Sequence, residues 1–566
     1  MYRASETIKQ ADMWKDPRLE MGKRTKAIFE DSEGWHHRFR REVTNRVNEE
    51  IFKPLYSDGT GSPNAPIRIL VAMTALKEGQ GISDEQLYEQ CRFNILIRSA
   101  LGLFNSGEEV PTESTYYLFR QKVSEYAECT GRNLIKESFA SITKEQCQEY
   151  AVSGKRIRMD SKLLGSNIGL YSRYRIVHET VKKYCAANGI TELAGKGNER
   201  LTSILKEQAE AVTYRSTKEE VEQLLAATGQ LLYRLLEAEG AEKNRDYALL
   251  KRVFEDQYEV ICGPGGGKKK RVKLREKHEI SSRSLQNPHD PDSEYRNKGG
   301  TKVKGYSINV TETCDEGSGL EPALNLIVDV RAEGCSISDV EYLQDGLAKA
   351  QEIVVDKIEE VYTDGAYHSP GNQEYCKEKG IDWVLPGIQG KPSKYDLSFD
   401  ANGNLVVVNT QSGQQLEAKS SKSRNPLTEG SAPPPERWVI KDGDNSPIYF
   451  EQKDVETCEL RKRLGAIPKE RLDIRNNVEA TIFQLGYHYR ADKSQYRGLM
   501  KHGIWANIRC LWINFRRIHL WITRKAGNSG SIERSNLKEN FAFTFFIKFL
   551  HGYWGIFRQP VFAGIY

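Results

Sequence analysis

The sequence predicts an α/β protein in which a mixed sheet flanked by helices is combined with an all-α N-terminal domain and two insertions, one helical and one partly β. Alternating apolar residues mark strands at 155–160 and 303–313. Apolar residues three and four positions apart mark helices before, between and after these strands. At 566 residues the chain is too long for one core, so several domains are expected.

The composition is that of an ordinary globular protein, with 28% charged and 38% hydrophobic residues. The net charge is only +5, so any nucleic-acid surface must come from local clusters of basic residues. Two clusters are present. Residues 266–304 hold twelve Lys or Arg against five acids, and residues 501–566 hold ten against two.

The ten cysteines are scattered without a CxxC pair, which suggests neither a zinc site nor a disulfide scaffold and fits a reducing cytoplasm. The N-terminus lacks the apolar core of a signal peptide. The apolar run at 541–550 is too short to span a bilayer. We therefore expect a cytoplasmic protein without a membrane partner.

Residues 1–150 predict a helical N-terminal domain. After Pro66, an apolar series with three-and-four spacing predicts a helix with one buried stripe, formed by Ile67, Leu70, Val71, Thr74 and Ala75. Ser83 and Gln86 form a capping box that opens the next helix. A third helix is expected to begin after Pro111.

The first core segment, 151–173, contains the strand that leads into Asp160. A helical insertion at 174–262 follows, and a seam within it packs on itself or dimerises: Val221, Leu225, Thr228, Leu232 and Leu235. Residues 263–294 are predicted to be a basic linker. Its GPGGGKKK run does not fit a phosphate-binding loop, because Lys268 is followed by Lys269 rather than by Ser or Thr.

The core resumes at 295–389. Strands at 303–313 and 324–331 predict a hairpin, and a helix at 338–352 returns the chain to a strand that ends at Asp364. The exit of such a strand is where functional side chains collect in α/β sheets. Asp364 and Gly365 also form an ordinary turn dipeptide.

The last third begins with a mixed β and loop insertion at 390–460. Residues 461–525 contain a predicted helix at 472–484, on which Arg475 and Glu479 lie four residues apart and share a face. The next helix has a buried stripe at helical spacing, made of Trp505, Ile508, Leu511 or Trp512, and Phe515. The aromatic tail at 526–566 has no assigned place.

Asp160, Asp364 and Glu479 occur in the order and settings of the acidic triad of bacterial insertion-sequence DDE transposases, which the chain resembles. The resemblance implies an RNase H-like mixed sheet and cleavage and strand transfer of DNA at element ends. It also implies that the three acids bind two Mg²⁺ (or Mn²⁺) ions, which would activate the nucleophile and neutralise charge on the attacking and leaving oxygens. The N-terminal helices would recognise the element ends.

The family's glutamate helix carries the pattern Tyr, two residues, Arg, three residues, Glu, six residues, Lys. This chain keeps the spacing of Arg475 and Glu479 but has Leu472 and Gly486 at the Tyr and Lys positions. Two later cations, Arg490 and Lys493, are candidates to replace the lysine. The predicted DNA-binding residues are Lys298, Lys302, Lys304, Arg475, Arg490, Lys493 and Arg497.

Each acid also has a structural interpretation: a turn for Asp364, a strand end for Asp160, and for Glu479 an ion pair worth about 0.3 kcal/mol. Asp329 and Asp382 are rival carboxylates. The alternatives to a transposase are an RNase H-like nuclease that cuts without joining and an inactive DNA-binding remnant. The expected partners are double-stranded DNA, both terminal repeats and target, and a second copy in a homodimer. The expected location is the bacterial cytoplasm, at the nucleoid during activity.

Overall fold

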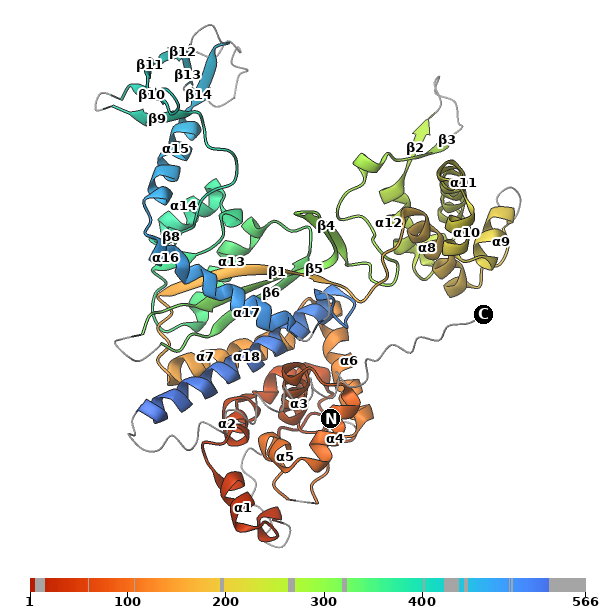
Figure 1. Cartoon of the computed structure of the whole chain (residues 1–566). Coiled ribbons are helices and arrows are strands. Elements are labelled where there is room, and N and C mark those ends of the chain that lie inside the picture. Colours follow the sequence, from red (N-terminus) through yellow and green to blue (C-terminus); the bar gives the residue numbers. More distant parts are fainter. Residues whose placement is uncertain are drawn as a thin grey trace, which may run out of the picture.

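A computed structural model gives the structure of the chain (Figure 1). It describes residues 1–528 except 6–15, 60, 106, 194–197, 263–269, 318–322, 401–402, 422–436, 442–445, 488 and 490–491. Three predicted features lie outside the described residues: the GPGGGKKK run except its last lysine, Arg490, and the aromatic tail after residue 528. None of the helices in the described ranges has the length and apolar character needed to cross a membrane.

The central sheet is mixed, as predicted. Its strands lie in the order β4-β5-β1-β7-β8, and β6 also pairs with β5. β1 is antiparallel to β5 and parallel to β7, and β7 is parallel to β8. An antiparallel hairpin beside three parallel strands is the RNase H-like arrangement. The strands are β1 (Arg156–Gly165), β4 (Glu294–Lys298), β5 (Thr301–Thr313), β6 (Ile327–Gly334), β7 (Glu360–Tyr362) and β8 (Asp382–Val384).

Three expected boundaries in this sheet change. The strand predicted at 155–160 runs on to Gly165, because β1 stays paired with the long strand β5 beyond Asp160. The strand predicted at 324–331 spans Ile327–Gly334, and its pairing with β5 shifts register between Thr311 and Glu312. Leu324 and Leu326 are apolar because they are buried in the core, although they precede the strand. The crossover predicted at 338–352 begins as a 3-10 turn, η6 (Asp339–Tyr342), and continues as α13 (Leu343–Ile353). After β7 come η7 (Gly365–Tyr367) and α14 (Pro370–Lys379), which lead to β8.

The N-terminal region is helical, and the predicted capping box of Ser83 and Gln86 is confirmed. The expected single stripe on the first long helix was wrong, because α3 is buried on all sides from Ile67 to Gly79. α18 (Leu499–Asn528) packs so closely on it that a Cβ at Gly79 would lie 2.1 Å from the ring of Trp512. The elements are η1 (Pro17–Leu19), α1 (Lys23–Glu30), α2 (Trp35–Glu42), η2 (Thr44–Arg46), η3 (Glu49–Leu55), α3 (Ile67–Gln80), α4 (Asp84–Phe93), α5 (Ile95–Leu101), α6 (Glu113–Thr130) and α7 (Leu134–Glu149).

The long helix α18 joins the N-terminal helices to the sheet (Figure 1). The predicted aromatic stripe of α18 is buried, as expected. It shares one hydrophobic core with α3 and with sheet residues Ile308, Val310 and Ile327. The opposite face of the sheet has its own core, in which Ile157 and Met159 pack against α13. Burial on both faces fixes the sheet that carries the candidate site.

The helical insertion has a separate hydrophobic core. Leu225, Thr228, Leu232 and Leu235 of the predicted seam are buried in it, so this seam packs within the insertion. The insertion lies to one side of the sheet in Figure 1. Its elements are α8 (Arg173–Asn188), α9 (Asn198–Lys206), α10 (Ala209–Arg215), α11 (Lys218–Leu236), η4 (Ala241–Lys243), α12 (Tyr247–Gln257), β2 (Tyr258–Cys262), β3 (Lys270–Leu274) and η5 (Lys277–Glu279).

The second insertion contains two three-stranded sheets around a small core. They are β9 (Tyr395–Phe399), β10 (Leu405–Asn409) and β11 (Gln415–Glu417), then β12 (Lys419–Ser421), β13 (Arg437–Ile440) and β14 (Ile448–Glu451). α15 (Gln452–Gly465) leads back toward the central sheet (Figure 1).

The helix predicted at 472–484 is broken into three pieces, so the expectation of one continuous helix was wrong. The pieces are α16 (Lys469–Asp473), the 3-10 turn η8 (Ile474–Asn476) and α17 (Asn477–Gly486). The break lies where the Arg158 guanidinium of β1 donates to the carbonyl of Ile474, at 3.0 Å. A tertiary contact that the local sequence does not encode therefore accompanies the turn.

Candidate active site

The two predicted aspartates follow the paired residues of neighbouring parallel strands. Asp160 lies within β1, opposite Val310 of β5, rather than at the strand end that the sequence predicted, and Asp364 follows the end of β7. The last paired residues of β1 and β7 are Arg158 and Tyr362, and Asp160 and Asp364 each lie two residues further along. Side chains two residues apart on a strand point to the same face. Two acids that are far apart in the chain thus lie at the same end of the sheet.

Asp364 also has the turn role that its sequence suggested. Its Oδ1 accepts a hydrogen bond from the Ala366 N–H at 3.1 Å and caps η7. A Cβ at Gly365 would lie 2.1 Å from the Gly387 carbonyl oxygen, so the position requires glycine. The turn fixes the carboxyl group at the strand exit and uses one of its two oxygens.

Arg475 links Asp160 to the predicted glutamate. Its guanidinium lies 3.8 Å from Asp160 Oδ2 and 3.5 Å from Glu479 Oε1, so the expected pair of Arg475 and Glu479 is present. The Asp160 side chain is 21% exposed, whereas that of Glu479 is 64% exposed. The contact therefore runs from a largely buried strand position out to the surface of α17.

The electrostatics of Asp160 reflect this neighbourhood. Burial raises the pKa of Asp160 to about 6, and the nearby charge of Asp364 contributes to the rise. The Ser161 N–H and the charges of Arg475 and Lys298 act in the opposite direction. The charges of Asp364 and of Lys298 of β4 thus act on Asp160 in opposite directions.

One cation, the Arg475 guanidinium, contacts two of the three candidate acids. Among the residues that the structure describes, no three His, Cys, Asp or Glu side chains form a group that could hold a metal ion. The Arg475 guanidinium lies between Asp160 and Glu479 and supplies the positive charge there. The three acids carry the hard oxygen donors that Mg²⁺ prefers, but the described residues do not bring all three together as the sequence predicted.

The rival carboxylates have structural partners. Asp329 is buried in β6 and lies 2.8 Å from Lys136 Nζ of α7, so it ties a helix to the sheet. Asp382 begins β8 and lies 2.6 Å from the Arg471 guanidinium of α16. Both pairs account for these acids without catalysis.

The predicted DNA-binding cations divide into two groups. Lys298 and Lys302 are exposed and pair across the β4–β5 hairpin with Thr301 and Asn297, next to a turn at Gly299 and Gly300. Three others donate to backbone carbonyls of the loop after β1: Lys304 to Tyr171 at 3.1 Å, Lys493 to Ile168 at 2.7 Å and Arg497 to Asn167 at 2.7 Å. These three cations hold the loop that leads into the helical insertion.

Lys162 is a cation near the site that the sequence did not single out. It follows Asp160 by two residues and so shares its face of β1. A Cβ at Gly486 would lie 2.7 Å from Lys162 Cε, and Lys162 Nζ pairs with Asp492 at 2.7 Å. A lysine from β1 therefore lies beside the helix position at which the family pattern has a lysine. This place of Lys162 beside the helix follows from the packing of β1 against α17 and from no local sequence pattern.

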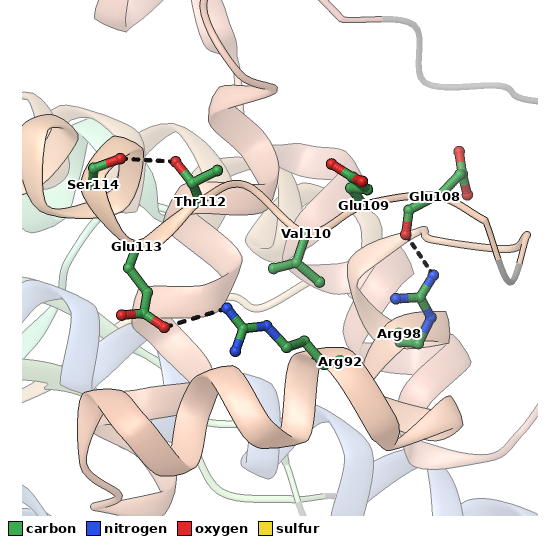
Figure 2. Close-up of a pocket in the computed structure, with 8 residues that line it drawn as sticks. All are labelled: Arg92, Arg98, Glu108, Glu109, Val110, Thr112, Glu113 and Ser114. Atoms are coloured by element: carbon green, nitrogen blue, oxygen red, sulfur yellow. Dashed lines mark hydrogen bonds and ion pairs between the residues drawn. The ribbon is translucent and has the colours of Figure 1, made fainter.

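A hollow of about 600 Å³ in the N-terminal helices is not part of this site (Figure 2). The two arginines that line the hollow have partners in the same lining. Arg92 pairs with Glu113 at 3.3 Å, and Arg98 donates to the Glu108 carbonyl at 2.8 Å. The lining carries as many as three glutamates, which disfavours a phosphate ligand.

Two family models match the chain. Residues 28–122 match the "Transposase domain (DUF772)", and residues 272–515 match the "Transposase DDE domain". Together they cover more than half of the sequence, and the second contains Asp364 and Glu479. The chain belongs to the DDE transposases of insertion sequences. No curated protein and no solved structure gives a match.

Membership makes this protein a DNA-binding transposase of a family that uses divalent metal ions. Asp160 precedes the matched DDE range, from which the helical insertion separates it in sequence. In this transposase it is the pairing of β1 with β5 and β7 that brings Asp160 to the same sheet.

Proposed function

We propose that this transposase cuts DNA at the ends of its own element and joins the ends to target DNA, with Asp160, Asp364 and Glu479 as the catalytic acids. The observation that carries the proposal is the position of Asp160 and Asp364, each two residues beyond the last paired residues of the adjacent parallel strands β1 and β7, with Arg475 joining Asp160 to Glu479. Acids on separate elements around one point are what metal-assisted phosphodiester chemistry requires.

Asp160, Asp364 and Glu479 would hold Mg²⁺, in a pair of ions. When bound, the metal would lower the pKa of the attacking water or 3′-hydroxyl and neutralise charge on the attacking and leaving oxygens. Arg475 keeps the acids neutralised before that, because its guanidinium contacts two of them. In the complex, Arg475 would exchange a carboxylate partner for a DNA phosphate, which it can bind with two parallel hydrogen bonds.

The DNA path would follow exposed cations and rings around the acids. Lys298 and Lys302 form the basic hairpin at one side, and Lys162 would take the role of the missing helix lysine. Phe483 and Tyr487 lie four and eight residues after Glu479 on the exposed side of α17, with 63% and 47% of their surfaces accessible. Exposed rings next to cations suit the stacking of unpaired bases.

The remaining modules have proposed tasks. The helical N-terminal domain, 1–150, would recognise the element ends, and residues 295–389 and 461–525 would supply the catalytic core together with 151–173. A homodimer would hold two element ends together. The insertions at 174–262 and 390–460 would extend the protein along DNA, with 263–294 as a basic linker.

The decisive experiment measures cleavage and joining of duplexes that carry the element ends, with Mg²⁺. Asp364→Asn should lower the cleavage rate by roughly 10³-fold or more, about 4 kcal/mol in the barrier, with end binding kept. Asp382→Asn is the matched control, since this exposed acid pairs with Arg471 of α16, and its rate should stay within about twofold.

The products separate the alternatives. A joined product supports the transposase, and cleavage without joining supports the nuclease. End binding without metal-dependent cleavage supports the inactive remnant. Normal cleavage by Asp364→Asn would show that the proposed triad is wrong.

A further inference from the structure

A fully buried carboxylate lies beneath the candidate site. Glu312 of β5 is 0% exposed and pairs with Arg158 of β1 at 2.6 Å and with Arg517 of α18 at 2.7 Å. Burial alone would raise the pKa of Glu312, but the charges of Arg517 and Arg158 hold it below its ordinary value. Glu312 is therefore an ionised group between two guanidinium groups.

The cluster of Glu312, Arg158 and Arg517 forms hydrogen bonds with both ends of the segment 474–481, which carries Arg475 and Glu479. At the start, Arg158 donates to the Ile474 carbonyl at 3.0 Å. At the other end, the Thr481 hydroxyl donates to Glu312 Oε2 at 2.9 Å and accepts from Arg517 at 2.5 Å. All three ionic groups of the cluster thus act on residues 474–481.

Besides these hydrogen bonds, the segment has the contact of Arg475 with Asp160 at 3.8 Å and an apolar side. The segment is not one regular helix. It contains the 3-10 break at Ile474–Asn476, so it is not a stiff continuation of α16. The apolar side of α17, with Val478 and Leu485, buries the helix but leaves rotation and sliding poorly defined. Hydrogen bonds to a fixed charge are directional and define both.

Net stability does not explain the cluster well. A buried ion triad repays its desolvation cost only partly, and apolar replacements of equal volume are often as stable. Three charged groups that all meet one short segment are better explained by positioning. We propose that Glu312, with Arg158 and Arg517, is a positioning group that fixes residues 474–481 so that Glu479 faces the two aspartates. This inference rests on the proposed catalytic role of Glu479.

The test uses Thr481, because Thr481→Val removes the hydroxyl while keeping the shape of the side chain. Thr481→Ser restores the hydroxyl. Thr228→Val is a matched control, since Thr228 is a buried threonine that accepts from Arg200 at 3.0 Å within the helical insertion. Full-length proteins are compared by thermal melting, end binding, cleavage at saturating DNA, and Mn²⁺ binding followed by electron paramagnetic resonance.

We expect Thr481→Val to lower kcat for cleavage at least tenfold and to weaken Mn²⁺ binding at least threefold, with end binding unchanged. Thr481→Ser should recover to within threefold of the wild type. Thr228→Val should leave kcat and Mn²⁺ binding unchanged. A second variant, Glu312→Gln, should keep the shape, lower kcat further than Thr481→Val, and weaken Mn²⁺ binding.

Normal kcat and Mn²⁺ binding in Thr481→Val would overturn the positioning role. An equal loss in Thr481→Val and Thr228→Val would also overturn it, because the effect would then be one of general stability. Neither result touches the proposed function, which is tested separately by the cleavage rate of Asp364→Asn and by the products that the wild type forms.

Discussion

The helical insertion and the segment 474–481 are both helical additions to the sheet, yet they are held by opposite means. The insertion buries leucines such as Leu232 and Leu250 in a core of its own. The segment 474–481 is held through Ile474 and Thr481 by buried ions of the sheet and α18. Burial of apolar surface holds the insertion, whereas directional hydrogen bonds to buried charged groups hold residues 474–481.

The difference teaches what each region tolerates. An apolar core is non-directional, so the insertion can shift slightly without losing its stability. A carboxylate that must meet two others has no such freedom, because small displacements of a reacting group are costly in rate. Changes in the insertion should therefore affect stability, and changes under α17 should affect chemistry.

The largest expected contrast uses two buried leucines. Leu250→Ala in the insertion and Leu485→Ala in α17 should each cost about 2–5 kcal/mol of local stability. Leu485→Ala should also slow cleavage by roughly tenfold or more, about 1.4 kcal/mol, because it loosens the catalytic helix. Leu250→Ala should stay within about twofold of the normal rate. Hydrogen exchange locates the lost stability, and equal rates in both variants would break the comparison.

A second contrast concerns the free energy of unfolding that is lost when Asp160 carries its negative charge. The pKa of Asp160 is raised to about 6, so the folded state binds its proton more tightly than the unfolded state. The stability that protonation provides is present below about pH 4 and is lost as the pH rises through about 6. Without metal at pH 8, Asp160→Asn should therefore raise the free energy of unfolding by roughly 3 kcal/mol.

The gain from Asp160→Asn should shrink as the pH falls through about 6. Urea unfolding at several pH values measures it, and the exposed Asp382→Asn serves as control. Destabilisation by Asp160→Asn at pH 8 would mean that the charge of Asp160 supports the fold.

The smallest expected effect distinguishes free cations from those that hold backbone. Lys298 is exposed, whereas Lys304 donates to the Tyr171 carbonyl and burial lowers its pKa. Lys298→Ala should reduce the slope of log Kd against log salt by about 0.9, the value for one phosphate contact. Lys304→Ala should leave that slope unchanged. Filter binding over a salt series measures both, and the reverse order would contradict this division of the basic residues.

Local patterns predicted elements well where burial followed a simple period. The capping box at Ser83, the strand before Thr313 and the buried stripe of α18 are as expected. Local sequence patterns gave wrong predictions where several neighbouring segments pack against one helix. α3 carries Arg68 and Lys77 on positions that look exposed, but both are buried against neighbouring segments. The helix expected at 472–484 breaks where Arg158 meets the Ile474 carbonyl.

The sequence by itself determined the class of the fold and the three candidate acids, because strand alternation, helix spacing and an aspartate at a strand exit are local properties. Tertiary structure alone decided the contacts of charged groups between elements that are distant in the chain. Arg475, Lys162 and Glu312 acquire their partners through strand pairing and helix packing across long stretches of chain. Ion pairs depend on distance in space, and no periodicity along the chain encodes it.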